Sequence, residues 1–393
     1  MKIFRPEPFG GVLYNPENLR FKLVSEIPDE EVLIKAPAKF VRKDILSAPV
    51  RAYFELTKKC NLACRHCFVS SSPKAEVGES TSNLKTVIDN LARNKVIDIR
   101  FTGGEVTVRS DWYELLEHAK SQGFVISVNT NGVYNDPDSV IDQLASLDLE
   151  QVTISIDGNR EAHDFMRGRG SYDKSVDALK RMYARGIATR INCVLTQKNV
   201  NDVSHLVELA SEYAREINFF HMRPVGRGVG QNKLSLNFDQ HFDSAEETLA
   251  LRERYPGLSI MHFEQSYRER SIRRGEAGSL DDSFSHGNTT INIDCFGGVW
   301  PNGYNTYQDE RLLLGNLVTE DLGAIWNGSQ KLEGIRRWQR AIQDKCKGCD
   351  EYLQRCPGLS PEMEIAKLNQ GVDNNFCVND SPVPALYGSY IDE

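Results

Sequence analysis

The stretch Ala52–Cys67, AYFELTKKCNLACRHC, leads from a candidate β-strand into a cysteine-rich segment. Its three cysteines have the spacing C-x3-C-x2-C: Cys60, Cys64 and Cys67. Short cysteine spacings in a reducing compartment are typical of metal or cluster ligands rather than of disulfides. Three thiolates hold three irons of a [4Fe–4S] cube and leave the fourth iron open, because a fully ligated cube takes four cysteines. For the spacing alone, zinc with His66 as a fourth ligand is the alternative.

The chain from residue 51 to about 223 alternates between candidate strands and candidate helices. The candidate strands are 52–57, 97–102, 124–129, 151–157, 188–195 and 217–223. The candidate helices between them are 82–94, 111–122, 138–146, 173–185 and 202–215. Alternation of this kind predicts parallel strands with crossover helices. The fold class is therefore α/β, either a partial (β/α)6 TIM-like barrel or a doubly wound sheet.

Alternate residues of these strands are polar, and this favours the partial barrel. In the strand 97–102 the polar residues are Asp98, Arg100 and Thr102. In the strand 217–223 the corresponding set is Phe219, His221 and Arg223. A parallel strand covered on both faces would be apolar throughout, and a closed barrel fills its centre with branched aliphatic side chains. With helices outside, the polar set faces inward, which predicts a wide, wet cavity for a large ligand.

Composition and flanking segments suggest three domains. Residues 1–48 are expected to form an N-terminal β-hairpin followed by a proline-containing linker, and residues 49–275 the barrel. Residues 276–393 form the C-terminal part, with a hairpin near 289–301, a helix near 321–343 and a second cysteine group.

Charge and hydropathy exclude several classes of protein. The chain of 393 residues has 47 Lys+Arg against 55 Asp+Glu, a net charge of −8, which argues against a general nucleic-acid binder. No apolar stretch approaches the roughly 18 residues of a membrane span, and the first residues contain no apolar signal region. We therefore expect a cytoplasmic protein that binds neither nucleic acid nor membrane.

Four further segments follow candidate strands in the same order along the chain. They are Phe101–Glu105 (FTGGE), Asn129–Gly132 (NTNG), Ser155–Gly158 (SIDG) and His163–Gly168 (HDFMRG). Each segment alone is a weak signal. Together with the first three cysteines and the aromatic Phe68, they resemble the radical SAM superfamily over roughly residues 50–225.

This resemblance implies a [4Fe–4S] cluster on the first three cysteines and S-adenosylmethionine (SAM) beside it. In the family the Gly-Gly-Glu segment binds the amino group of SAM, and the Ser and Arg of later segments contact its carboxylate or ribose. The implied SAM contacts are Thr102, Gly103, Gly104, Glu105, Asn129, Asn131, Ser155, Asp157, Arg167 and Leu195. The implied reaction is reductive cleavage of SAM to a 5′-deoxyadenosyl radical that abstracts hydrogen from a substrate. A flavodoxin- or ferredoxin-type reductant supplies the electron.

The second cysteine group resembles the SPASM domain of radical SAM enzymes that modify peptides. Four thiolates suit a fully ligated auxiliary [4Fe–4S] cluster, with a structural zinc as the alternative: Cys346, Cys349, Cys356 and Cys377. Three cysteines of the full pattern are absent, at positions near Asn302, Phe284–His286 and Ser360. We therefore expect two clusters in all, one that binds SAM and one auxiliary.

Two cysteines remain. Cys193 lies on the apolar parity of its strand and is expected to be a buried structural thiol. Cys295 lies in the C-terminal hairpin, which is expected to face the barrel mouth. There it is a candidate hydrogen-atom donor to a substrate radical, or else an inert cysteine.

The function that these features favour is maturation of a ribosomally made peptide by crosslinking or a related change. The expected partners are a precursor peptide and a leader-binding protein that supplements the short N-terminal segment. The alternatives are a small-molecule dehydrogenase or oxidase of the alcohol or haem-precursor type, and a peptide epimerase that uses a cysteine donor. The SAM motifs disfavour a protein that only transfers electrons.

Overall fold

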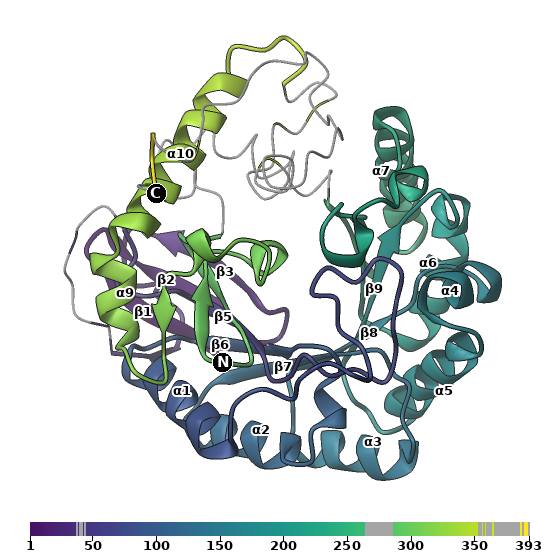
Figure 1. Ribbon diagram of the computed structural model, residues 1–393, viewed down its shortest axis with the longest axis horizontal. Coiled ribbons are helices and arrows are strands. Elements are labelled where there is room, and N and C mark those ends of the chain that lie inside the picture. Colours follow the sequence, from purple (N-terminus) through teal and green to yellow (C-terminus); the bar gives the residue numbers. More distant parts are fainter. Residues whose placement is uncertain are drawn as a thin grey trace.

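The computed structural model describes residues 1–36, 45–263 and 286–352, and in addition residues 38, 42, 356, 358, 364, 386 and 389–391. These residues form two sheets, one of ten strands and one of four (Figure 1). Among the described helices, none is long and apolar enough to cross a membrane.

The larger sheet contains the six expected strands, which run parallel and neighbour one another in chain order. They are β5 (Arg51–Glu55), β6 (Asp98–Thr102), β7 (Val125–Thr130), β8 (Gln151–Ser155), β9 (Thr189–Leu195) and β10 (Glu216–His221). The sheet curves but does not close, and this confirms the partial barrel.

Two further strands extend the parallel sheet beyond the expected six. β11 (Ser259–His262) pairs with β10, and β12 (Thr290–Ile293) pairs with β5. β12 continues into an antiparallel hairpin with β13 (Gly298–Trp300), which pairs with β14 (Gly315–Asn316). The C-terminal hairpin is therefore continuous with the barrel sheet and lies beside the strand that leads to Cys60.

The helices line the outer side of this sheet (Figure 1). The five expected ones are α1 (Thr81–Arg93), α2 (Trp112–Ser121), α3 (Pro137–Ser146), α5 (Ser171–Ala184) and α6 (Val203–Tyr213). Two more were not expected, namely α4 (Arg160–Arg167) and α7 (Phe238–Arg254). Polar N-caps begin several of them. For example, the Ser80 side chain accepts a hydrogen bond from Asn83 N at the start of α1.

The helix expected near 321–343 is two helices, α9 (Leu322–Gly328) and α10 (Gln330–Cys346). The break is at Ser329, whose backbone is extended (φ −71°, ψ 113°). The Ser329 hydroxyl accepts a hydrogen bond from Leu332 N and caps the new helix. Ser329 is a residue type that favours N-cap positions, but the apolar periodicity continues across it and therefore predicted one helix.

The strand register corrects the predicted inward set of β10. Arg190 pairs with Glu216 and Asn192 with Asn218, so Asn218 and Phe220 face inward and Phe219 and His221 face the helices. Phe219 is buried in the core, and the His221 ring lies 4.9 Å from the His241 ring of α7. Because Phe219 and Phe220 are consecutive aromatic residues, alternation could not fix the parity of this strand.

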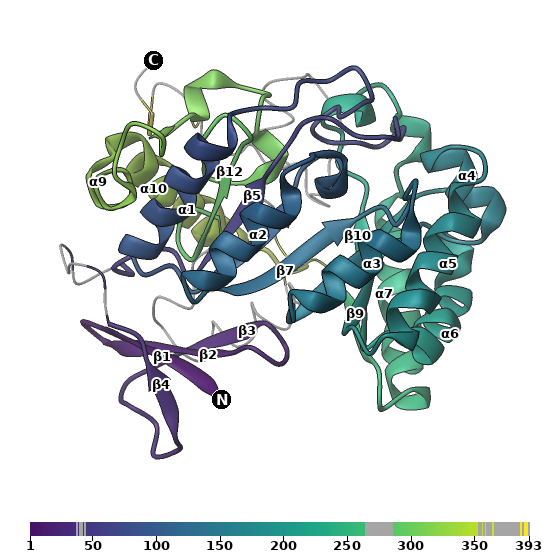
Figure 2. The ribbon, with the colours of Figure 1, turned by 90° about the horizontal axis from the view of Figure 1, so that it is seen from below.

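The expected N-terminal hairpin is present as part of a four-stranded sheet, and this sheet covers one end of the barrel (Figure 2). Its strands are β1 (Lys2–Glu7), β2 (Gly10–Asn15), β3 (Arg20–Val24) and β4 (Val32–Ile34). The Tyr14 hydroxyl donates to Asp98 Oδ2 at 2.6 Å, and Arg51 donates to Leu19 O at 2.6 Å. Since Arg51 and Asp98 begin β5 and β6, the sheet closes the amino-terminal end of the strands.

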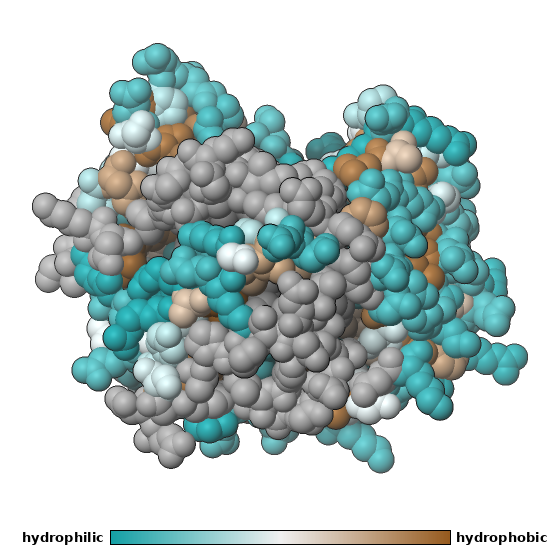
Figure 3. All heavy atoms as spheres, turned by 90° about the horizontal axis from the view of Figure 1, so that it is seen from above, coloured by the Kyte–Doolittle hydropathy of each residue, from teal (hydrophilic) through white to brown (hydrophobic). Residues whose placement is uncertain are grey.

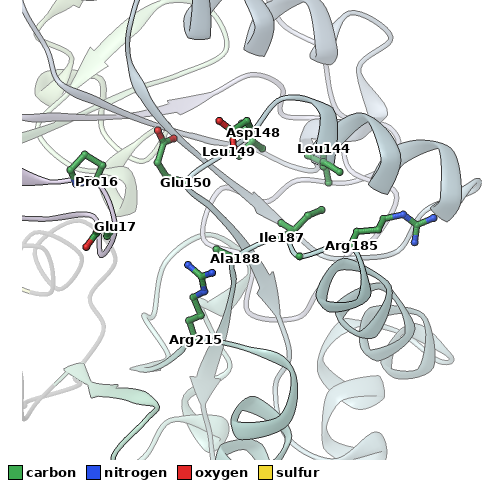
Figure 4. Close-up of a pocket in the computed structure, with 12 residues that line it drawn as sticks. Pro16, Glu17, Leu144, Asp148, Leu149, Glu150, Arg185, Ile187, Ala188 and Arg215 are labelled. Carbon is green, nitrogen blue, oxygen red and sulfur yellow. The ribbon is translucent and has the colours of Figure 1, made fainter. Parts of the chain in front are cut away.

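A pocket of about 420 Å³ lies at this closed end (Figure 4). The turn residues Pro16 and Glu17 line one side, and the loops before β8, β9 and β10 line the other. Parallel α/β folds carry their chemistry at the opposite, carboxyl ends of the strands. We therefore place the functional site at the other end. On the side of the molecule seen in Figure 3, the described side chains are mostly hydrophilic.

Candidate active site

The three cysteines Cys60, Cys64 and Cys67 lie on the loop that leaves the carboxyl end of β5, hereafter the cluster loop (residues 58–70). Backbone N–H groups point at two of the sulfurs: Leu62 N lies 3.4 Å from Cys60 Sγ, and Ser71 N lies 3.3 Å from Cys67 Sγ. Such N–H···S bonds stabilise thiolate ligands. Three thiols on one loop with these donors fit a cube that has one open iron.

The geometry around His66 bears on the zinc alternative. His66 Nε2 lies 3.3 Å from Asp157 Oδ2, and the imidazole is almost fully buried. Within the described part of the chain, no three His, Cys, Asp or Glu side chains converge on a single ion position. A cube does not need such convergence, since each thiolate binds a different iron.

Gly103 and Gly104 place the turn after β6 directly against the cluster loop. Gly103 has φ +141°, and a Cβ on Gly104 would lie 2.1 Å from Lys59 O. Gly104 N donates to Thr57 O at 2.6 Å and Glu105 N to Lys59 O at 3.0 Å. The two glycines are therefore required for a backbone–backbone contact that sets the start of the cluster loop, with Thr102 half-buried before them.

Glu105 is not presented to the cavity in this structure. Its carboxylate is fully buried, and both oxygens accept hydrogen bonds, from Thr107, from the Thr130 hydroxyl and from Asn131 N (2.8 Å). Burial raises the pKa of Glu105, while these hydrogen bonds lower it. The carboxylate thus joins the Gly-Gly-Glu turn to the Asn129–Gly132 segment, and we expect it to act as a positioning group.

Replacing Glu105 by glutamine is expected to destabilise the fold more than it weakens SAM binding. The variant leaves at least one buried N–H donor without an acceptor, at a cost of about 1–3 kcal/mol. The apparent unfolding midpoint and the SAM dissociation constant, both measured anaerobically, test this. Glu114→Gln, on the exposed face of α2, is the control. An unchanged midpoint with a much weaker SAM affinity would instead place the carboxylate on the SAM ammonium.

Asn131 connects the segment after β7 to the cluster loop. Its amide donates to Asn61 Oδ1 at 2.8 Å and lies 3.7 Å from Cys60 Sγ. Asn129 and Ser155 are half-buried at the inward-facing carboxyl ends of β7 and β8. The structure therefore brings these three predicted residues to the same end of the barrel as the cysteines.

Asp157 and Arg167 form a buried ion pair behind the cluster loop. Arg167 Nε donates to Asp157 Oδ2 at 2.6 Å, and Val194 N donates to Asp157 Oδ1 at 2.8 Å. Burial opposes ionisation of Asp157, but the Arg167 and His66 charges outweigh it and lower the pKa of the carboxyl to about 2. Because His66 belongs to the cluster loop, the pair fixes that loop to β8 and β9.

The side chain of Leu195, one of the predicted SAM contacts, faces away from the barrel interior. Its side chain is fully buried in the helix-facing core, since Leu195 pairs with the outward-facing His221. The inward-facing neighbour at this level of β9 is Val194, which is partly buried beside Met166 and Met222. A side-chain contact from β9 to a ligand in the barrel therefore comes from Val194, not Leu195.

A loop after β10 also holds the cluster loop, and the sequence analysis missed it. A Cβ on Gly226 (φ +55°) would lie 2.3 Å from Phe68 O. Arg227 Nε donates to Cys64 O at 2.8 Å and Arg227 N to Cys67 O at 3.0 Å. The available signal was the glycine-rich run Gly226–Gly230, which begins a few residues after β10 ends.

Cys295 belongs to a buried polar cluster between β5 and the C-terminal hairpin. Its Sγ lies 3.5 Å from the Tyr307 hydroxyl, and Asn292 donates to Glu55 Oε1 at 3.0 Å. The thiol is fully buried, and a Cβ on Gly78 would lie 2.9 Å from Cys295 Sγ. Cys295 therefore lies beside the barrel mouth, but the half-buried Tyr307 is the member of this pair with exposed surface.

Glu55 should make stability depend on pH. Burial raises the pKa of Glu55 to about 8, although Asn292 and Tyr307 act to lower it. Between its unfolded pKa near 4.5 and about 8, the folded protein retains a proton that the unfolded chain has lost. The unfolding free energy therefore falls as pH rises, by up to about 1.4 kcal/mol per pH unit. Glu55→Gln should have a shallower profile between pH 5 and 8, and parallel profiles would contradict this assignment.

The second cysteine group lies at the end of α10. Cys349 N donates to Cys346 O at 3.0 Å, and Cys356 N donates to Glu351 O at 3.0 Å. A Cβ on Gly358 would lie 3.6 Å from Cys346 Sγ. The backbone therefore places Cys349 one turn after Cys346, and Gly358 beside the Cys346 thiol. Cys377 lies outside the described residues, as do Phe284 and Ser360.

Cys193 has the surroundings of a structural thiol. It is fully buried on the helix-facing side of β9, and the Asn199 amide lies 3.6 Å from its sulfur. This matches the expectation from its parity.

Comparison with known proteins matches two parts of the chain to known families. Residues 54–210 match the radical SAM superfamily, and residues 285–350 match the SPASM iron–sulfur cluster-binding domain. The mycofactocin maturase MftC of Mycobacterium tuberculosis is 33% identical over 349 residues, which cover 87% of this chain and 86% of that one. An AdoMet-dependent heme synthase of Methanosarcina barkeri is 24% identical over 352 residues, covering 84% and 97%. Streptococcus suis SuiB bound to its precursor peptide SuiA has the same fold, with a TM-score of 0.74 at 17% identity, covering 96% and 100%.

Proposed function

Because the chain belongs to the radical SAM superfamily and carries its SPASM iron–sulfur domain, we propose that it modifies a ribosomally made precursor peptide. The observation that carries the proposal is the 33% identity to a maturase over 349 residues. SAM and [4Fe–4S] clusters are its cofactors. When bound, they supply a 5′-deoxyadenosyl radical that abstracts a hydrogen atom from the substrate.

The inward face of the barrel suits a large polar substrate. The side chains on it are half-buried: Tyr53, Arg100, Asn129, Ser155, Asn192 and Asn218. Since the N-terminal sheet closes the other end, a substrate enters from the carboxyl ends of the strands, where the cluster loop lies. A peptide with many backbone donors and acceptors fits such a lining better than an apolar metabolite does.

We expect one auxiliary cluster rather than two, held by Cys346, Cys349, Cys356 and Cys377. The segment after β13, where an inner-cluster ligand is missing at Asn302, packs instead onto the barrel. Thr306 accepts a hydrogen bond from Asn292 at 3.0 Å, and Tyr304 contacts Phe68 with ring centroids 5.3 Å apart. This packing of the segment against Asn292 and Phe68 supports a single auxiliary cluster.

A leader-binding partner protein belongs to the same proposal. The edge strand β4 of the N-terminal sheet exposes Leu33 (57%) and Ile34 (59%). An exposed strand edge can pair with an added strand, and apolar side chains along it add affinity.

The experiment that tests the proposal supplies two substrate classes in parallel. Anaerobic protein with SAM and a reductant is incubated with the peptide encoded by a neighbouring small reading frame, or with an iron porphyrin precursor of haem. We expect a mass change in the peptide together with 5′-deoxyadenosine. A changed porphyrin and an unchanged peptide would establish the second candidate, which the heme synthase relative at 24% identity supports.

Cys295 remains the proposed hydrogen donor of a reaction that returns hydrogen to the substrate, such as epimerisation. In that case Cys295→Ala should still form 5′-deoxyadenosine but yield a peptide without solvent deuterium in D2O. Tyr307→Phe should lower deuterium incorporation, because it removes the hydroxyl 3.5 Å from the thiol. Cys193→Ala, which also removes a buried thiol, is the control. Equal deuterium incorporation by Cys295→Ala and wild type would exclude the donor role.

A further inference from the structure

An exposed aromatic side chain lies between two cations beside the cluster loop. Phe165 of α4 is 39% exposed. The Arg65 guanidinium lies 4.5 Å from the ring centroid and the Lys198 ammonium lies 5.3 Å from it. We call these three residues the cationic patch. Figures 1 and 2 both show the loop after β5 beside α4.

The backbone holds the cationic patch in place. Arg65 N donates to Met166 O at 2.9 Å, and Arg65 Nε donates to Phe165 O at 2.9 Å. Lys198 follows β9 in a turn where its N–H donates to the Thr196 hydroxyl at 3.2 Å. The three side chains therefore come from three different segments that the fold brings together, and they form a preorganised surface.

The charges of the cationic patch are not neutralised by the protein itself. Within the described part of the chain, neither Arg65 nor Lys198 forms an ion pair, whereas exposed arginines elsewhere do, for example Arg181 with Asp138. The exposed acid on the same helix is Glu161, one turn before Phe165. In a chain of net charge −8, two adjacent unpaired cations around an exposed ring indicate an acidic partner.

The position of Arg65 indicates what that partner delivers. Arg65 lies between the cluster ligands Cys64 and Cys67, so the cationic patch is protein surface at the cluster itself. We propose that Arg65, Phe165 and Lys198 dock an acidic one-electron carrier protein that reduces the SAM-binding cluster. The carrier loses one electron and the cluster gains it, with no bond made or broken. This inference rests on the reductive cleavage of SAM and not on the peptide substrate.

The test compares a protein that donates electrons with a small molecule that donates electrons, without added peptide. The initial rate of 5′-deoxyadenosine formation is measured against the concentration of reduced flavodoxin, and separately with dithionite. For Lys198→Glu we expect the half-saturating flavodoxin concentration to rise about tenfold at low salt. The dithionite rate should stay within about twofold of wild type. Added salt should also raise the half-saturating flavodoxin concentration for the wild-type protein.

Lys180→Glu is the matched control, because Lys180 is an exposed lysine that also lies over an aromatic ring, Tyr213, at 5.2 Å. It should behave as wild type with both donors. Arg65→Gln provides a second variant, with the cluster absorbance checked first. Wild-type flavodoxin dependence in both Lys198→Glu and Arg65→Gln would overturn the proposal. An equal loss of the 5′-deoxyadenosine rate with flavodoxin and with dithionite would also overturn the proposal, because the substitution would then act on the cluster and not on docking.

Discussion

Replacing Cys60, Cys64 and Cys67 together by alanine is expected to reduce 5′-deoxyadenosine formation to the level of the protein-free reaction. The three thiols lie on one loop, with backbone N–H groups directed at two of the sulfurs. Without these three ligands no iron is left open to SAM. The measurement is 5′-deoxyadenosine by mass spectrometry after anaerobic incubation with SAM and dithionite.

Iron content supplies the control for this variant. Wild type should bind about eight irons and the triple variant about four, counting four per cube. The remaining four identify an intact auxiliary cluster and a folded C-terminal part. About twelve irons in wild type would contradict a single auxiliary cluster, and 5′-deoxyadenosine from the triple variant would contradict the site.

Asp157→Asn is expected to lower the unfolding free energy by about 3–5 kcal/mol, because it leaves the Arg167 guanidinium buried without its carboxylate. The side chain of Asp157 is fully buried and that of Arg167 is 10% exposed. SAM cleavage by the remaining folded protein should also fall, since Asp157 holds His66 of the cluster loop at 3.3 Å. Anaerobic thermal unfolding and the rate of 5′-deoxyadenosine formation are the two readouts.

The matched control is another buried ion pair of the barrel, between Arg190 and Glu216 (2.6 Å), at the amino-terminal end of the strands. Glu216→Gln should cost a similar amount of stability yet leave SAM cleavage by the folded fraction unchanged. If Asp157→Asn has wild-type stability, or if the two variants lose SAM cleavage equally, the Asp157–Arg167 pair does not hold the cluster loop.

The strands of the barrel could be predicted because their alternation is strong and their ends carry the motifs. The predictions of strand parity and of strand pairing failed where the local sequence pattern carries no information about them. The consecutive aromatics Phe219 and Phe220 left the parity of β10 open, and only pairing with β9 fixed it. The attachment of β11 and β12 to the sheet depends on contacts between distant segments, which periodicity does not encode.

In the site as well, some features could be predicted from the sequence and others could not. The motif residues Gly104 and Asn131 lie at the cluster loop as their order after the strands predicted. The direction of a side chain was not predictable, because Glu105 turns into the core to satisfy Thr130 and Leu195 faces the helices. Short motifs locate a backbone segment, but hydrogen bonds and register decide which atoms reach the ligand.

Deuterium transfer from substrate to SAM-derived product tests the central claim most directly. The protein is incubated anaerobically with SAM, reductant and the neighbouring-gene peptide carrying deuterium at its carbon-bound positions. The account predicts deuterated 5′-deoxyadenosine that accumulates together with an altered peptide. Unlabelled 5′-deoxyadenosine with an intact peptide would contradict the claim that this chain abstracts hydrogen from a ribosomally made peptide.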